Sequence, residues 1–71
     1  MTWARIGAVI FPLSSVTSIV VKPTADSRFY VEVSRYAGGY LVTHQTPTVA
    51  TKAEADLRAE RIAHGVYWEG S

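Results

Sequence analysis

Hydrophobic and polar positions alternate most regularly over residues 28–36. Phe29, Val31 and Val33 occupy alternate positions, and residues that tolerate water stand between them. Successive side chains of a strand point to opposite faces, so this pattern predicts a strand over 28–36. The three apolar residues are expected to face a core, and the intervening residues to face outward.

A hairpin is predicted directly after this strand. Gly38 and Gly39 can adopt positive φ angles, which the tightest hairpin turns require. Residues 40–46 then read as the return strand. Pro47 ends it, because proline has no N–H to donate to a ladder of backbone hydrogen bonds.

The region before residue 28 is the most apolar part of the chain. Residues 3–11 are rich in branched and aromatic side chains and predict a strand buried on much of both faces. Residues 12–15 break the pattern with proline and serines, which favour turns. Residues 16–22 predict a second strand, so this region is expected to form a buried β-hairpin.

A helix is predicted over residues 52–64. Thr51 can cap its first N–H groups, and Glu54 completes a capping-box pattern. Gly65 can adopt the left-handed conformation that ends a helix. His64 lies at this end, where the helix dipole favours positive charge.

One side of this helix is suited to pack on a sheet. Ala55, Ala59 and Ile62 fall on a single narrow stripe at 100° per residue. Leu57 falls on nearly the opposite side. It is either an ordinary exposed leucine or a contact for a partner.

The order of elements predicts an α+β fold formed by residues 1–71 as one small domain. Sequential hairpins favour a four-stranded antiparallel meander, packed by one C-terminal helix. Val66 to Ser71 follow the helix, and Tyr67 and Trp68 are expected to fold back on the sheet or the helix edge. Gly70 and Ser71 are interpreted as a possible cloning remnant.

Composition narrows the range of functions. The chain has 71 residues and no cysteine, so neither a disulfide nor a cysteine-based zinc site can stabilise it. A domain of this size buries only about 60% of its unfolded surface, which raises the expectation of a homodimer. Seven basic residues oppose six acidic ones, and their distribution forms no strongly basic patch.

Location and origin are inferred from the same composition. Residues 6–21 are too short and too polar for a membrane span of about 20 apolar residues, so no membrane association is expected. The absence of cysteine is compatible with a cytoplasmic protein. The preference for alanine and for arginine over lysine favours a bacterial or phage origin.

The sequence offers little to an enzyme. Ser14, Ser15 and Ser18 lack the glycine-flanked elbow of an activated serine, and they read as turn and strand residues. His44 and His64 alone do not supply a metal site, and His44 is expected on the strand surface. No catalytic residue, metal or cofactor is therefore predicted.

The outer face of the predicted sheet is the best candidate for binding. Tyrosine and arginine are enriched at interaction hot spots, so docking on a protein is the leading hypothesis. The alternative is that these tyrosines bind no partner and only stabilise the sheet, because tyrosine favours strands and pairs well across them. The predicted partner-binding residues, with the last two as secondary candidates, are Tyr30, Arg35, Tyr36, Tyr40, Leu57 and Trp68.

Nucleic-acid binding is the runner-up. Aromatic and basic residues on a sheet suit the stacking of bases, and Arg28, Arg35 and Tyr36 would carry this role. Phosphate contacts would make such binding fall steeply with salt.

A resemblance bears on this alternative. The hairpin followed by the run from Thr51 to Ala55 resembles the end of the arm-type DNA-binding domain of phage tyrosine integrases, over residues 28–64. That family packs a three-stranded sheet against a C-terminal helix, and its sheet enters the DNA major groove. The resemblance implies the sheet-plus-helix layout, and it implies a nucleic-acid partner as an expectation.

Overall fold

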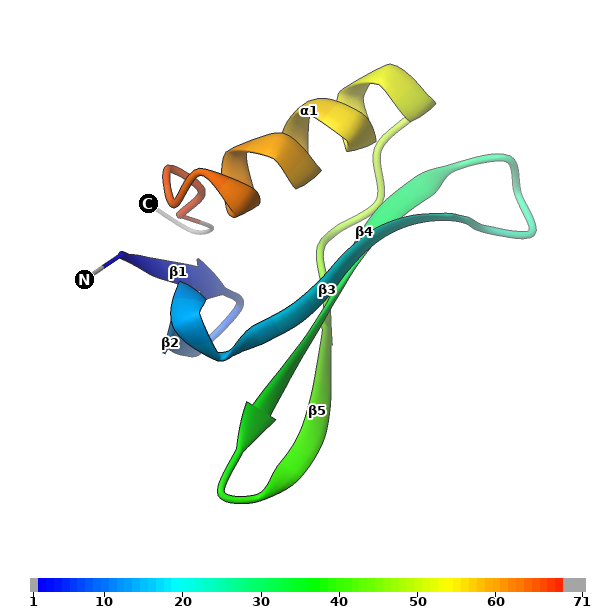
Figure 1. The fold of residues 1–71 in the computed structure, drawn as a ribbon. Coiled ribbons are helices and arrows are strands. Elements are labelled where there is room, and N and C mark those ends of the chain that lie inside the picture. Colours follow the sequence, from blue (N-terminus) through cyan, green and yellow to red (C-terminus); the bar gives the residue numbers. More distant parts are fainter. Residues whose placement is uncertain (1, 69–71) are drawn as a thin grey trace.

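The computed structural model describes residues 2–68 (Figure 1). The chain has an α+β fold with antiparallel sheets and one C-terminal helix, as predicted. A short 3₁₀ turn at Leu13–Ser15 lies where the sequence predicts a break. The strands and the helix are β1 (Trp3–Ile6), β2 (Val9–Pro12), β3 (Val16–Pro23), β4 (Phe29–Ala37), β5 (Tyr40–Gln45) and α1 (Lys52–Ala63).

The predicted four-stranded meander is wrong in one respect. The strands form two sheets, β1–β2 and β3–β4–β5, because the predicted strand over 3–11 is itself a hairpin. Gly7 adopts a φ of 61°, whereas Ala8 has no positive φ, which matches the glycine-first, two-residue hairpin turn. The chain therefore reverses inside the apolar run instead of continuing through it.

In the larger sheet, β4 is the central strand. It pairs antiparallel with β3 on one side and with β5 on the other. Gly38 and Gly39, at φ angles of 59° and 87°, form the predicted turn between β4 and β5. This hairpin extends away from α1 (Figure 1).

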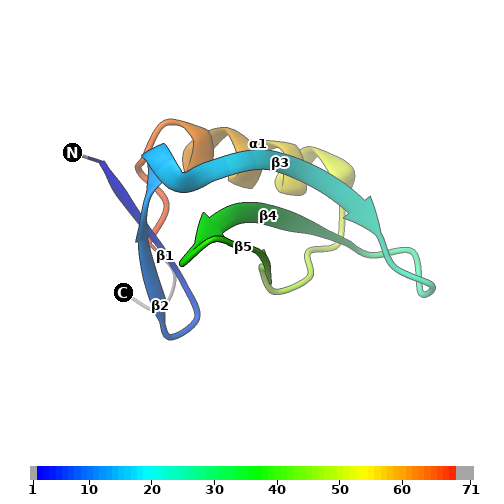
Figure 2. The same cartoon turned by 60° about the horizontal axis from the view of Figure 1, so that its bottom comes forward.

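The core lies between the larger sheet and the helix. α1 packs against β3 and β4 and covers one face of the sheet, which we call the inner face (Figure 2). The β1–β2 hairpin closes one end of this layer and contributes Phe11. The buried apolar side chains of the core are Ala4, Ile6, Phe11, Val31, Val33, Ala55 and Ile62.

The helix begins and ends as its sequence predicts. The Thr51 hydroxyl accepts a hydrogen bond from the Glu54 N–H, at 3.2 Å. At the other end, Gly65 has a φ of 73°, and its N–H donates to the Ile62 carbonyl. The Val66 N–H donates to the Arg61 carbonyl, which completes a Schellman motif.

The tail folds back, as predicted for Tyr67 and Trp68. Tyr67 is partly buried against the core. Trp68 forms a parallel bridge with Arg5 of β1. Gly70 and Ser71, interpreted as a cloning remnant, lie outside the described residues.

Candidate docking surfaces

The face of the β3–β4–β5 sheet opposite the helix is the outer face. Tyr36 of β4 and Leu41 of β5 are cross-strand partners on it, and each is 59% exposed. Val20 of β3 points to the same side, because its cross-strand partner Glu32 belongs to the outward set of β4. Within residues 2–68, no element packs over this face (Figure 2).

The charges on the outer face neutralise each other. The Lys22 ammonium lies 2.7 Å from the Glu32 carboxylate. The hydrogen bond between them lowers the pKa of Glu32 and raises the pKa of Lys22. The Lys22 ammonium is therefore not available as an isolated contact for a phosphate.

Arg35 does not lie on this face, contrary to the grouping predicted for it. It continues the alternate series of Val31 and Val33, so its side chain points to the inner face. Its Nε donates to His44 Nε2 at 2.8 Å, and its guanidinium lies 5.0 Å from the centroid of the Phe11 ring. Arg35 therefore helps to hold β2 against the β4–β5 hairpin.

His44 shares this inner position rather than the strand surface predicted for it. Its ring stacks on Phe11, with centroids 5.2 Å apart and an interplanar angle of 9°. Burial lowers the pKa of His44, and the nearby Arg35 guanidinium lowers it further. The neutral ring is then the form that accepts the hydrogen bond from Arg35.

The three tyrosines of the predicted site do not form one cluster. Tyr30 and Tyr36 share the outer face, but they stand six positions apart along β4, which is about 20 Å. Tyr30 is half-buried near Lys22. Tyr40 pairs with Ala37, which places it toward the opposite face at the hairpin end, where it is 77% exposed. Only Tyr36 combines high exposure with an apolar neighbour on the outer face.

The residues of the nucleic-acid alternative are likewise separated. Arg28 precedes β4, and its guanidinium donates to the Thr48 hydroxyl at 3.0 Å and to the Thr48 carbonyl at 3.2 Å. Arg35 lies on the inner face, and Tyr36 lies on the outer one. The three side chains therefore do not converge on one surface.

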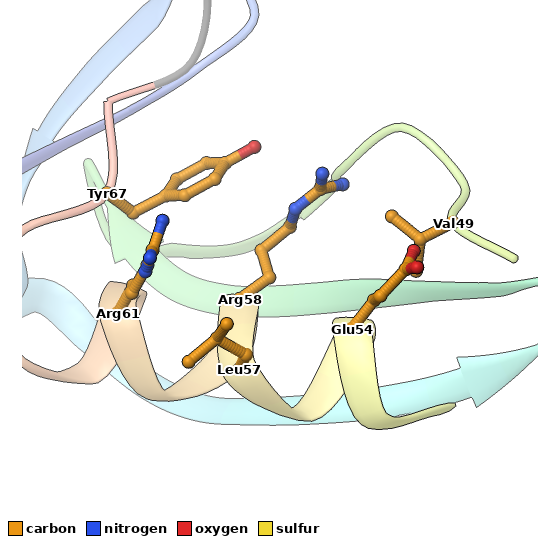
Figure 3. A pocket seen from close by; sticks show the side chains of 6 residues that line it. All are labelled: Val49, Glu54, Leu57, Arg58, Arg61 and Tyr67. Carbon is orange, nitrogen blue, oxygen red and sulfur yellow. The ribbon is translucent and has the colours of Figure 1, made fainter. Parts of the chain in front are cut away.

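Leu57, the secondary candidate on the helix, lines a hollow of about 260 Å³ (Figure 3). Arg58 crosses this hollow: it donates to the Pro47 carbonyl at 2.7 Å, and its guanidinium lies 5.7 Å from the Tyr67 ring centroid. This volume is below the usual range for small-molecule sites and suits a single side chain. The hollow is lined by Val49, Glu54, Leu57, Arg58, Arg61 and Tyr67.

The sequence did not reveal a third exposed apolar region. Trp3 and Ile10 lie on the side of the β1–β2 hairpin that faces away from the core, and both are partly exposed. Trp68, the other secondary candidate, joins this side through its bridge to Arg5. A turn at Gly7 pairs Trp3 with Pro12 and Arg5 with Ile10, and cross-strand partners share a face. If a turn had been predicted there from the sequence, Trp3 and Ile10 would have been expected on this outward side.

Two further observations concern other kinds of site. Within residues 2–68, no three histidine, aspartate or glutamate side chains gather closely enough to hold a metal ion. The helix found in the same residues is not of the length and apolar character that crossing a membrane requires.

Comparison with known proteins gives no match. No family model, no curated protein and no solved structure matches the chain. The resemblance to arm-type integrase domains stays a prediction.

Proposed function

We propose that this chain is a small, non-enzymatic interaction protein that docks on a protein partner through the outer face of its β3–β4–β5 sheet. The observation that carries the proposal is the pairing of Tyr36 and Leu41, both well exposed, on a sheet face that no described element covers. Tyrosine is enriched at interaction hot spots, and neighbouring contacts of little energy of their own exclude water from such a residue. The helix contributes by supporting the inner face, so that the outer face stays rigid.

The chemistry of the outer face favours a neutral partner surface. Its charged pair, Lys22 and Glu32, is internally neutralised. Ser34 and Thr43 pair across the middle of the face and offer hydroxyl groups beside Tyr36 and Leu41. A partner that combines an apolar patch with hydrogen-bonding groups would match this arrangement.

The proposal is tested by affinity capture with matched variants. Tyr36→Ala and Leu41→Ala remove the exposed apolar contact without changing the core. Each should therefore lower the affinity for a captured partner at least about tenfold. Leu57→Ala is the control, because Leu57 is 50% exposed on the helix, away from the sheet. It should retain the partner.

Two results would count against this assignment. A partner that both outer-face variants retain would show that docking uses another surface. A partner that only Leu57→Ala releases would move the site to the hollow on the helix. Circular dichroism of each variant separates loss of binding from loss of folding.

Nucleic-acid binding is distinguished by its salt dependence. We expect no mobility shift with duplex DNA at low salt. A shift that weakens steeply with salt and is lost in both Arg28→Ala and Arg35→Ala would replace protein docking with the nucleic-acid alternative.

A further inference from the structure

The strand β5 presents an open edge. Within residues 2–68, β5 pairs with β4 alone. The Thr46 N–H, directly after β5, donates to the Val31 carbonyl of β4 at 3.0 Å. Backbone groups of an antiparallel strand alternate between its two sides, so those of Leu41, Thr43 and Gln45 point away from β4.

The other edge of the same sheet is protected, whereas β5 is not. β3 carries Lys22 and ends at Pro23, which has no N–H to offer. A bulge between Val16 and Ser18 interrupts its regular pattern. Lysine, proline and bulges are the devices by which natural sheets keep an edge strand from pairing with another chain.

None of these devices occurs in β5. Its six residues include no lysine and no proline. Its only ionisable side chains are those of Tyr40 and His44. Its register with β4 runs without a shift from the Ala37–Tyr40 pair to the Glu32–Gln45 pair. The edge is therefore regular, uncharged and open to a further strand.

We propose that β5 pairs antiparallel with β5 of a second copy of this chain, which joins two three-stranded sheets into one continuous sheet. A two-fold axis at Thr43 satisfies the geometry. It places Thr43 opposite Thr43 of the second copy and Leu41 opposite Gln45, and these are the residues whose backbone groups point outward. It also keeps like faces together and opposes no like charges.

The dimer extends beyond the proposed function but is compatible with it. The axis stands perpendicular to the sheet, so the outer faces of both copies lie on the same side. Edge pairing uses the backbone of Leu41, whereas docking uses its side chain. An experiment can therefore disprove the dimer without disproving the docking, and the reverse.

The first test is the mass in solution over a dilution series, combined with hydrogen exchange of single amides. The amides of Leu41, Thr43 and Gln45 should become protected as concentration rises. The amides of Val42 and His44, which face β4, should be protected at every concentration. A chain that stays monomeric throughout would overturn the proposal, and so would a dimer in which the Leu41 and Thr43 amides exchange as in the monomer.

A pair of variants provides the second test. Thr43→Lys places two ammonium groups opposite each other at the axis and should weaken the dimer by about fivefold or more. Ser18→Lys puts the same charge at an exposed position on β3 and should leave the dimer unchanged. Equal weakening by both variants would show that added charge, not the β5 edge, controls association. Tyr36→Ala should lose the docking partner and keep the dimer, which separates failure of one proposal from failure of the other.

Discussion

The inner and outer faces of the three-stranded sheet come from the same strands but serve different purposes. On β4, Val31 and Val33 are fully buried against the helix, whereas Tyr36 on the opposite side is largely exposed. Burial of apolar area provides most of the stabilisation of a small domain, so the inner face determines whether the chain folds. The outer face is then free to carry side chains chosen for contact with another molecule.

The largest expected effect comes from Phe11, which covers one end of the inner face. Phe11→Ala should lower the free energy of unfolding by about 3–5 kcal/mol, because it removes a buried ring and leaves a cavity. That is a large part of the stability of a domain of this size. Tyr36→Ala truncates a ring on the outer face and should cost less than about 1 kcal/mol. The free energies of unfolding of both variants are measured by urea denaturation. Equal losses would contradict the conclusion that only the inner face determines folding.

Gly65 tests how closely the helix end must approach Thr2, which directly precedes β1. It has a φ of 73°, and a Cβ added there would overlap the Thr2 side chain. Gly65→Ala should therefore cost more than the roughly 1–2 kcal/mol of a left-handed conformation alone. Gly38→Ala, at a φ of 59° with open space around it, is the control and should cost only that conformational part. If thermal melts show the same loss for both, the close approach contributes nothing.

His44 links the inner face to pH. Its pKa is lowered by burial and by Arg35, so below a pH of about 6.5 the unfolded chain binds a proton that the folded chain resists. Above that pH, His44 is neutral in both states and does not affect the free energy of unfolding. As the pH falls toward the lowered pKa, the free energy of unfolding decreases, because only the unfolded chain takes up the proton readily. We expect the urea midpoint to decrease between neutral and mildly acidic pH. In His44→Gln, which cannot titrate, this part of the decrease should be absent, and an unchanged slope would disprove the assignment.

The smallest effect is expected from the ion pair on the outer face. Glu32→Gln removes the charge that Lys22 faces at 2.7 Å, but the Lys22 ammonium is well exposed and water replaces the contact. The midpoint of thermal unfolding at neutral pH should be nearly unchanged, and added salt should reduce any difference further. A large loss of stability would mean that the outer face contributes to folding as well.

Local chemistry explains which parts of the fold could be predicted. The Thr51 cap and the Gly65 stop act within one turn of the helix, and both lie where the sequence places them. Gly38 and Gly39 act within one hairpin turn. Each of these signals depends only on neighbouring residues, so no knowledge of the rest of the chain is needed.

The division into two sheets and the side on which Arg35 lies were missed for different reasons. The turn at Gly7 lies in a run where apolar residues occupy both faces, so alternation gives no sign of a reversal. Whether β1–β2 joins the main sheet depends on packing through Phe11, which no local pattern encodes. The side of Arg35, by contrast, follows from its place in the alternate series of Val31 and Val33. Arg35 is grouped with the tyrosines in the sequence analysis because of its residue type, without use of its position in the strand.

The bridge between Arg5 and Trp68 has a practical consequence. Paired strands lie about 5 Å apart, so β1 and the last described residue, Trp68, lie side by side. Domains with this property tolerate insertion into a surface loop of a carrier protein. The β4–β5 hairpin extends away from α1 (Figure 1), so a carrier joined ahead of β1 and after Trp68 could display the outer sheet face for direct selection of binding partners.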